Sequence, residues 1–161
     1  MANIVHHLGI NVVPSRLYEA LTTKKGLASW LVAGINKSTY QEGDLVTFQF
    51  SEGCYSLMNI QKLVPNKLVE WKCVDQNFSK RNGWNNTFMR FEIMQSQDNN
   101  TLLTFSHMGW KEENAFYKYC LKRWSYFLGV SLHRFLENGD IEIDPYSFQR
   151  VPNSQKKILV S

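Results

Sequence analysis

Residues 111–139, KEENAFYKYCLKRWSYFLGVSLHRFLENG, contain no proline and carry large apolar side chains at every third or fourth position. The repeat runs through Phe116, Cys120, Trp124, Phe127, Ser131 and Phe135, and it is widened by Leu128, Leu132 and Leu136. Residues at this spacing share one side of an α-helix, so the stretch predicts one long amphipathic helix over residues 111–138. Asn138-Gly139 ends the pattern, because glycine readily adopts the left-handed conformation that closes a helix.

The chain before this helix has the alternation of strands, with one helical interruption. Residues 3–12 predict a first strand, and Pro14 then suits the first turn of a helix. Two short helices are expected between Pro14 and Trp30. Five further segments alternate with period two: residues 45–50, 55–64, 68–74, 87–94 and 101–108. Their connections are short enough for hairpins, so we expect an antiparallel meander.

This order of elements predicts an α+β protein. One helix cannot lie flush along a wide sheet, so we expect a curved antiparallel sheet wrapped around the helix over residues 111–138, a helix-grip arrangement. A length of 161 residues suits a single domain. We assign this domain to residues 1–139 and a C-terminal extension to residues 140–161, whose Ile158-Leu159-Val160 can dock on the domain as a strand.

Charge and cysteine usage argue against several classes of protein. The net charge is +4 at pH 7, but the basic residues come as scattered pairs rather than as one patch, so we expect no nucleic-acid partner. Three widely spaced cysteines without a C-x-x-C pair argue against a disulfide framework or a zinc site and fit a reducing cytosol. No stretch approaches 18 consecutive apolar residues, and the first residues lack a basic signal-peptide region. We therefore predict a cytoplasmic protein without a membrane span.

The aromatic content of 14% gives the first clue to function. Rings from separate elements would converge between the sheet and the long helix, where they either line a cavity for an apolar or aromatic small molecule or fill the space completely. The predicted cavity-lining residues are Trp30, Phe48, Phe50, Tyr55, Trp71, Met89, Phe91, Phe105, His107, Trp124, Phe127 and Leu128. The loop over residues 75–86 carries Phe78 and Trp84, and it is a lid, a partner-binding hairpin or a loop anchored by two rings.

His107 is the one ionisable candidate of this set on the strand over residues 101–108, and either it or Tyr55 could orient a ligand. His107 is in phase with Leu103 and Phe105 and should face the interior. An imidazole there can orient a ligand or act as a base, and the alternative is a structural histidine bonded to its neighbours. No nucleophile, paired carboxylate or metal-ligand cluster accompanies it in the sequence. We therefore predict no catalytic residue, no metal site and no cofactor.

Three motifs resemble a known family. Residues 13–22, VPSRLYEALT, with the following Leu27 and Trp30, are similar to the opening of the SRPBCC (START-like) superfamily. Within it, residues 101–109, TLLTFSHMG, resemble the group named after activators of the 90-kDa heat-shock-protein ATPase. The terminal-helix motif is matched by Trp124, Leu128, Leu132 and residues 136–139, although Arg123 stands where the family has glycine.

The resemblance implies a curved antiparallel sheet around a C-terminal helix, often with an apolar cavity, but it does not imply one activity. Three hypotheses follow. The first is a non-enzymatic binding protein for a hydrophobic small molecule. The alternative is a co-chaperone-like interaction domain that acts on a chaperone ATPase, with self-association as a further expected contact. The third, ranked last, is a cyclase- or hydrolase-type enzyme that uses His107.

Overall fold

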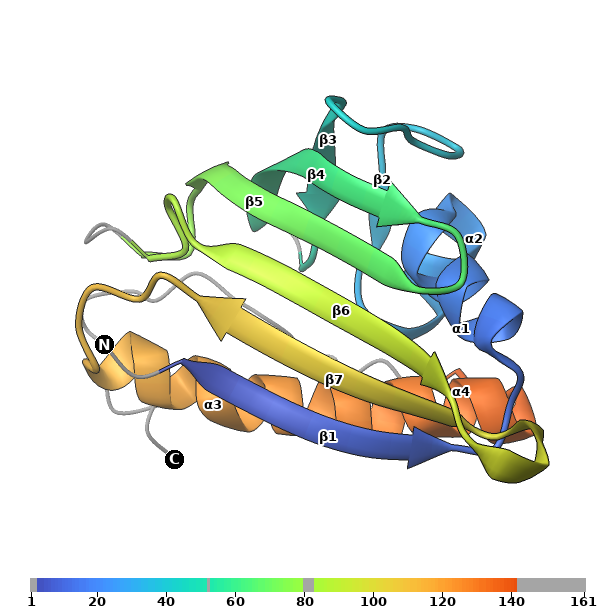
Figure 1. The fold of residues 1–161 in the computed structure, drawn as a ribbon. Helices are drawn as coiled ribbons and strands as arrows, with labels where there is room; N and C mark the ends of the chain where they lie inside the picture. Colours follow the sequence, from blue (N-terminus) through green and yellow to red (C-terminus); the bar gives the residue numbers. More distant parts are fainter. Residues whose placement is uncertain (1–2, 52, 80–82, 142–161) are drawn as a thin grey trace.

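The computed structural model describes residues 3–51, 53–79 and 83–141, and these form a seven-stranded antiparallel sheet with helices on one face (Figure 1). The strand order is β1-β7-β6-β5-β4-β3-β2. The strands are β1 (Ile4–Ile10), β2 (Gly34–Ile35), β3 (Leu45–Gln49), β4 (Tyr55–Val64), β5 (Leu68–Gln76), β6 (Phe88–Gln95) and β7 (Thr101–Met108). The predicted α+β helix-grip fold is confirmed. The two-residue strand β2 was not predicted, because it is too short to show alternation.

The two short helices follow β1 as expected. They are α1 (Pro14–Thr22), which begins at the proline, and α2 (Lys24–Trp30), whose first turn is capped by Thr23. The Thr23 hydroxyl accepts a hydrogen bond from the Gly26 amide at 2.9 Å. The Trp30 indole N–H then donates to the Ala20 carbonyl at 2.9 Å, which ties the two helices together at their buried side.

The long C-terminal helix is continuous, but it begins later than predicted. It comprises α3 (Ala115–Tyr126), a wider π-helical stretch (Phe127–Leu132) and α4 (His133–Asn138). Its start is set by Asn114, whose side chain accepts a hydrogen bond from the Tyr117 amide at 3.0 Å. The helix ends at Gly139, which has the predicted left-handed conformation, with φ of 78°. Residues 142–161, including Ile158-Leu159-Val160, lie outside the described residues.

The alternation of each strand places one set of side chains against the helices. Inward residues include Val46 on β3, Trp71 on β5 and Phe105 on β7, all fully buried. Register shifts between β4 and β5, at Leu57/Met58 and at Ile60/Lys62, mark irregularities of the kind that bend a strand and increase its twist. No helix of the described residues covers the opposite, outer face of the sheet (Figure 1).

Trp124 is the test of this assignment of faces. Its ring centroid lies 4.5 Å from that of Phe105, and the side chain is fully buried. Trp124→Ala should lower the free energy of unfolding by about 3–5 kcal/mol, because a large cavity remains. Urea denaturation measures the loss. The matched control is Leu121→Ala on the same helix, where a side chain 41% exposed should lose under about 1 kcal/mol. Equal losses for the two variants would contradict the assigned helix face.

Candidate functional site

The predicted cavity-lining rings converge between sheet and helix, and they contact one another. The ring of Phe48 packs on Trp71 with centroids 5.0 Å apart, and Trp71 packs on Phe91 at 4.8 Å. Phe91 lies 5.0 Å from Phe105, which contacts Trp124 on the helix. A continuous row of rings therefore crosses from β3 to α3. Eleven of the twelve predicted residues are at most 3% exposed: Trp30, Phe48, Phe50, Trp71, Met89, Phe91, Phe105, His107, Trp124, Phe127 and Leu128.

Tyr55 is the residue that the structure does not bring to this cluster. It is half-buried, and its hydroxyl lies 3.4 Å from Asp75 Oδ2. The alternation of β4 directs Ser56 and Met58 inward, so Tyr55 belongs to the outer face. The physical reason is the phase of the strand, which polar Ser56 conceals in the sequence.

The loop before β6 contributes two rings to the interior. Phe78 is 1% exposed and Trp84 is fully buried. Phe78 lies 5.3 Å from Phe50, and Trp84 stacks on Trp124 with centroids 5.9 Å apart and an interplanar angle of 16°. These contacts fit the anchored-loop interpretation. The two rings help to fill the space between sheet and helix, where a ligand cavity was predicted.

The side chain of Gln76 holds both ends of this loop. Its amide oxygen accepts hydrogen bonds from the backbone amides of Phe78 at 2.7 Å and Ser79 at 3.0 Å. Its amide nitrogen donates to the Ser79 carbonyl at 3.0 Å and to Asn85 Oδ1 at 2.8 Å. A Cβ at Gly83 would lie 2.6 Å from this amide, so a larger residue there would displace the Gln76 side chain from its hydrogen bonds. Sequence reasoning missed Gln76, because a glutamine at the end of a strand carries no periodic signal.

His107 is fixed in one protonation state by its hydrogen bonds. The Trp124 indole N–H donates to His107 Nδ1 at 3.0 Å, so Nδ1 carries no proton. His107 Nε2 lies 2.9 Å from Thr87 Oγ1, and that hydroxyl donates to the Trp84 carbonyl at 2.6 Å. The threonine oxygen must therefore accept from an Nε2–H group. The ring is neutral, and complete burial lowers its pKa to about 3.

In this arrangement both ring nitrogens of His107 are engaged by the protein, and neither faces a ligand or substrate. The buried thiols are equally unsuited to attack a substrate. Burial raises the pKa of Cys73 to about 12, so its thiol remains protonated. Among the described residues, no group of three His, Cys, Asp or Glu side chains could hold a metal ion.

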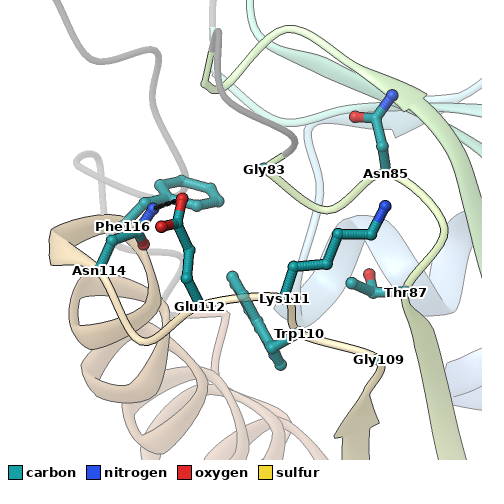
Figure 2. Close-up of a pocket in the computed structure, with 9 residues that line it drawn as sticks. All are labelled: Gly83, Asn85, Thr87, Gly109, Trp110, Lys111, Glu112, Asn114 and Phe116. Carbon is teal, nitrogen blue, oxygen red and sulfur yellow. Dashed lines mark hydrogen bonds between the residues drawn. The ribbon is translucent and has the colours of Figure 1, made fainter. Parts of the chain in front are cut away.

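A small pocket opens at the end of the sheet–helix space, between the loop 83–87 and the start of α3 (Figure 2). Thr87 and Trp110 line it and separate it from His107, with the Trp110 and His107 rings 4.7 Å apart. Lys111, Glu112 and Asn114 form its polar side (Figure 2). Its volume of about 10 Å³ admits one water molecule and no organic ligand.

Two of the buried polar atoms that have no hydrogen-bond partner among the described residues belong to fully or almost fully buried side chains. They are the hydroxyl of Ser56, which points inward from β4, and the indole N–H of Trp110. Both side chains are at most 3% exposed. A buried polar group without a partner costs about 1–3 kcal/mol, so these two atoms are the places where an added hydrogen bond would gain most.

The outer face of the sheet carries two adjoining hollows, which we call the outer groove. The first, about 400 Å³, lies across β5, β6 and β7 and includes Leu68, Arg90, Glu92, Met94, Leu102 and Thr104. The second, about 540 Å³, continues past the end of the sheet to Val13, Pro14, Ser15, Pro65 and Asn66. The two share Lys67, Ile93 and Met94.

The outer groove combines exposed apolar side chains with ion pairs. Met94 and Leu102 are paired across β6 and β7, and they are 65% and 45% exposed. Beside them the Arg90 guanidinium lies 3.7 Å from a carboxylate oxygen of Glu70 and 3.7 Å from one of Glu92. Apolar side chains surrounded by charged ones are typical of protein interfaces.

Comparisons with known proteins agree with this architecture. A family model described as Activator of Hsp90 ATPase homolog 1-like protein matches residues 11–137. The solution structure of the Aha1 dimer from Colwellia psychrerythraea is 33% identical, with a TM-score of 0.75, over 86% of this chain and 98% of that chain. A search of curated protein sequences finds no match. Among the described residues, no helix is long and apolar enough to cross a membrane.

Less similar structures support the fold alone. Protein SSP2350 from Staphylococcus saprophyticus is 16% identical, with a TM-score of 0.70, over 89% of this chain and 98% of that chain. Protein MLL2253 from Mesorhizobium loti is 18% identical, with a TM-score of 0.73, over 86% and 99%. The shared backbone therefore persists where the side chains differ.

The protonation state of His107 gives a pH prediction. Its folded pKa of about 3 lies below the ordinary value of 6.5, so the unfolded chain binds the extra proton between these values. The histidine's contribution to stability is complete above pH 6.5 and falls as pH drops toward 3, by up to about 1.4 kcal/mol per pH unit. Urea denaturation of the parent and of His107→Gln should show a shallower decline for the variant.

Nitrogen NMR on the unaltered chain provides the check if this variant fails to fold. The His107 ring should remain neutral, with the proton on Nε2, throughout the range from pH 7.5 to 5. Protonation of both ring nitrogens within that range would contradict the assigned hydrogen bonds.

Proposed function

The chain belongs to the Activator of Hsp90 ATPase homolog 1-like family, and from this premise we propose that it is a non-enzymatic protein-interaction domain. It acts on a chaperone ATPase of the 90-kDa heat-shock class through the outer face of its sheet. One observation carries the proposal. The space between sheet and helix is filled by the protein's own rings, whereas no helix or loop of residues 3–51, 53–79 and 83–141 covers the hollowed outer face.

The filled interior argues against a ready cavity. Phe78 and Trp84 would have to leave before an organic molecule could enter, and exposing two such rings costs roughly 3–6 kcal/mol. A ligand would have to offset that cost before it bound with measurable affinity. A partner on the outer face displaces no buried ring, because Met94 and Leu102 are exposed among the described residues.

Charge on the outer face supports a protein partner as well. Arg90, Glu70 and Glu92 form a line of ion pairs across β5 and β6, at the edge of the apolar part of the groove. Such a rim gives orientation and association rate, while the apolar centre supplies affinity. This division is the usual anatomy of a specific interface.

Self-association is part of the same proposal. The relative from Colwellia psychrerythraea is described as a dimer, and its similarity to this chain extends over 98% of its own length. We expect this chain to form a dimer at high concentration, which light scattering during size-exclusion chromatography measures. A constant monomer mass across the concentration series would contradict this part of the proposal.

The partner surface is tested by charge insertion. The double variant Met94→Glu with Leu102→Glu should weaken binding to the chaperone by roughly tenfold or more, because it places charges in the apolar centre. Calorimetry measures the affinity, and the chaperone's rate of ATP hydrolysis reports the effect on activity. Leu121→Glu is the matched control, because it places a charge at an exposed apolar position of α3, away from the outer groove, and it should bind as the parent does. Equal binding by both variants would contradict an outer-face site.

A second candidate function is supported by the two unpartnered polar atoms. A small apolar or aromatic molecule that displaced Phe78 and Trp84 would reach the interior, where either the Ser56 hydroxyl or the Trp110 indole N–H could bind its polar end. This is the hydrophobic-ligand function that the sequence suggested first. Gln76 would hold the loop ends while the rings moved.

Native mass spectrometry of freshly expressed protein tests this candidate through a co-purified mass. Ser56→Ala sharpens the test, because it removes a hydroxyl that has no partner in the described residues. The variant should match the parent's free energy of unfolding yet bind the extracted molecule about five- to tenfold more weakly. Protein free of any bound mass, together with no binding of extracted lipids or aromatics, would contradict the second candidate.

A further inference from the structure

The outer groove lies beside the point where the described chain ends. At the end of α4, the Glu137 carboxylate accepts a hydrogen bond from the Asn11 amide at 2.8 Å. Val13, which is two residues after Asn11 in the sequence, lines the groove. The next residue back, Val12, accepts a bond through its carbonyl from the Thr101 hydroxyl at 2.6 Å, and Thr101 adjoins Leu102. The exit of the helix and the apolar part of the groove are therefore joined through two hydrogen bonds.

The sequence continues from this exit for 20 more residues. Residues 142–161 end in the apolar run Ile158-Leu159-Val160. From Ile141 to Ile158 there are 17 residues, and a flexible segment of that length spans roughly 20–25 Å on average. Three neighbouring strands span only about 10–15 Å, so the apolar run can reach any part of the groove.

We propose that residues 142–161 fold back over the end of the sheet and that Ile158-Leu159-Val160 occupies the outer groove against Met94 and Leu102. Both groove side chains are exposed in the described residues, and an apolar segment of the same chain is the occupant with the highest local concentration. A short tether holds such a segment at an effective concentration near the millimolar range, which makes weak apolar contact sufficient.

Occupied in this way, the groove is shielded from outside partners until one displaces the segment. The inference does not rest on the proposed function, because it concerns the free chain. If the groove is also the chaperone surface, the extension is an internal competitor for it. The two ideas fail separately, since one is tested without a chaperone and the other with it.

A spin label on the last residue tests the contact. Cys54, Cys73 and Cys120 are buried, so Ser161→Cys can be labelled selectively in the folded full-length chain. The NMR signals of Met94 and Leu102 should lose most of their intensity. Leu45 is the matched control, because it is an exposed apolar residue on β3, three strands from β6, and its signal should persist.

Two arms identify the occupant. Replacing Ile158, Leu159 and Val160 by serine in the labelled chain should restore the Met94 and Leu102 signals, whereas Tyr146→Ser with Phe148→Ser should leave them quenched. In a second experiment, spin-labelled chain that contains no nitrogen-15 is mixed with nitrogen-15 chain that carries no spin label. Quenching in that mixture would show that a second copy occupies the groove and would overturn the proposal. Unchanged signals in the labelled chain itself would overturn it equally.

Discussion

The hydrogen bond from the Trp124 indole to His107 is the contact on which the sheet–helix interface depends. It joins α3 to β7. The imidazole also bonds to the Thr87 hydroxyl, which in turn bonds to the loop that carries Trp84. Each donor and acceptor in this series of hydrogen bonds is buried, and a buried donor or acceptor without a partner is costly. The arrangement allows a row of bulky, partly polar rings to pack at a dry interface with one definite register between helix and sheet.

The same requirement explains how the interior accommodates several tryptophans. Besides Trp124, the indole of Trp30 bonds to the Ala20 carbonyl, that of Trp71 to the Tyr40 hydroxyl at 3.1 Å, and that of Trp84 to Cys120 Sγ at 3.3 Å. Every partner comes from a different part of the chain. Aromatic packing alone would permit rings to slide, whereas these bonds fix each one. A core fixed in this way adapts poorly to ligands of different shape, which favours a role for the outer face of the sheet.

Much of the architecture was predictable because it follows from the spacing of apolar residues along the sequence. Phe116, Cys120 and Trp124 marked the helix face, and the alternation around Phe105 placed His107 inside. The cluster of buried rings was predicted for the same reason. The prediction that Tyr55 faces the interior missed the phase of the strand, because polar Ser56 is the residue that faces the core. Whether the rings enclose a cavity depends on Phe78 and Trp84, whose depth is decided by packing between distant segments and by Gln76 rather than by any local pattern.

The π-helical stretch from Phe127 to Leu132 is wider than the α-helical turns on either side of it. Such a stretch holds one residue more than a regular α-helix would over the same rise. Trp124, just before the stretch, faces the sheet, and Ser131 within it donates a hydrogen bond to the Trp30 carbonyl at 2.7 Å. Deleting one residue from this stretch would restore a regular α-helix over the same rise, so α4 would keep Leu136 in the core and Glu137 beside Asn11. Deleting one residue from a regular turn would instead rotate the rest of the helix by about 100° about its axis.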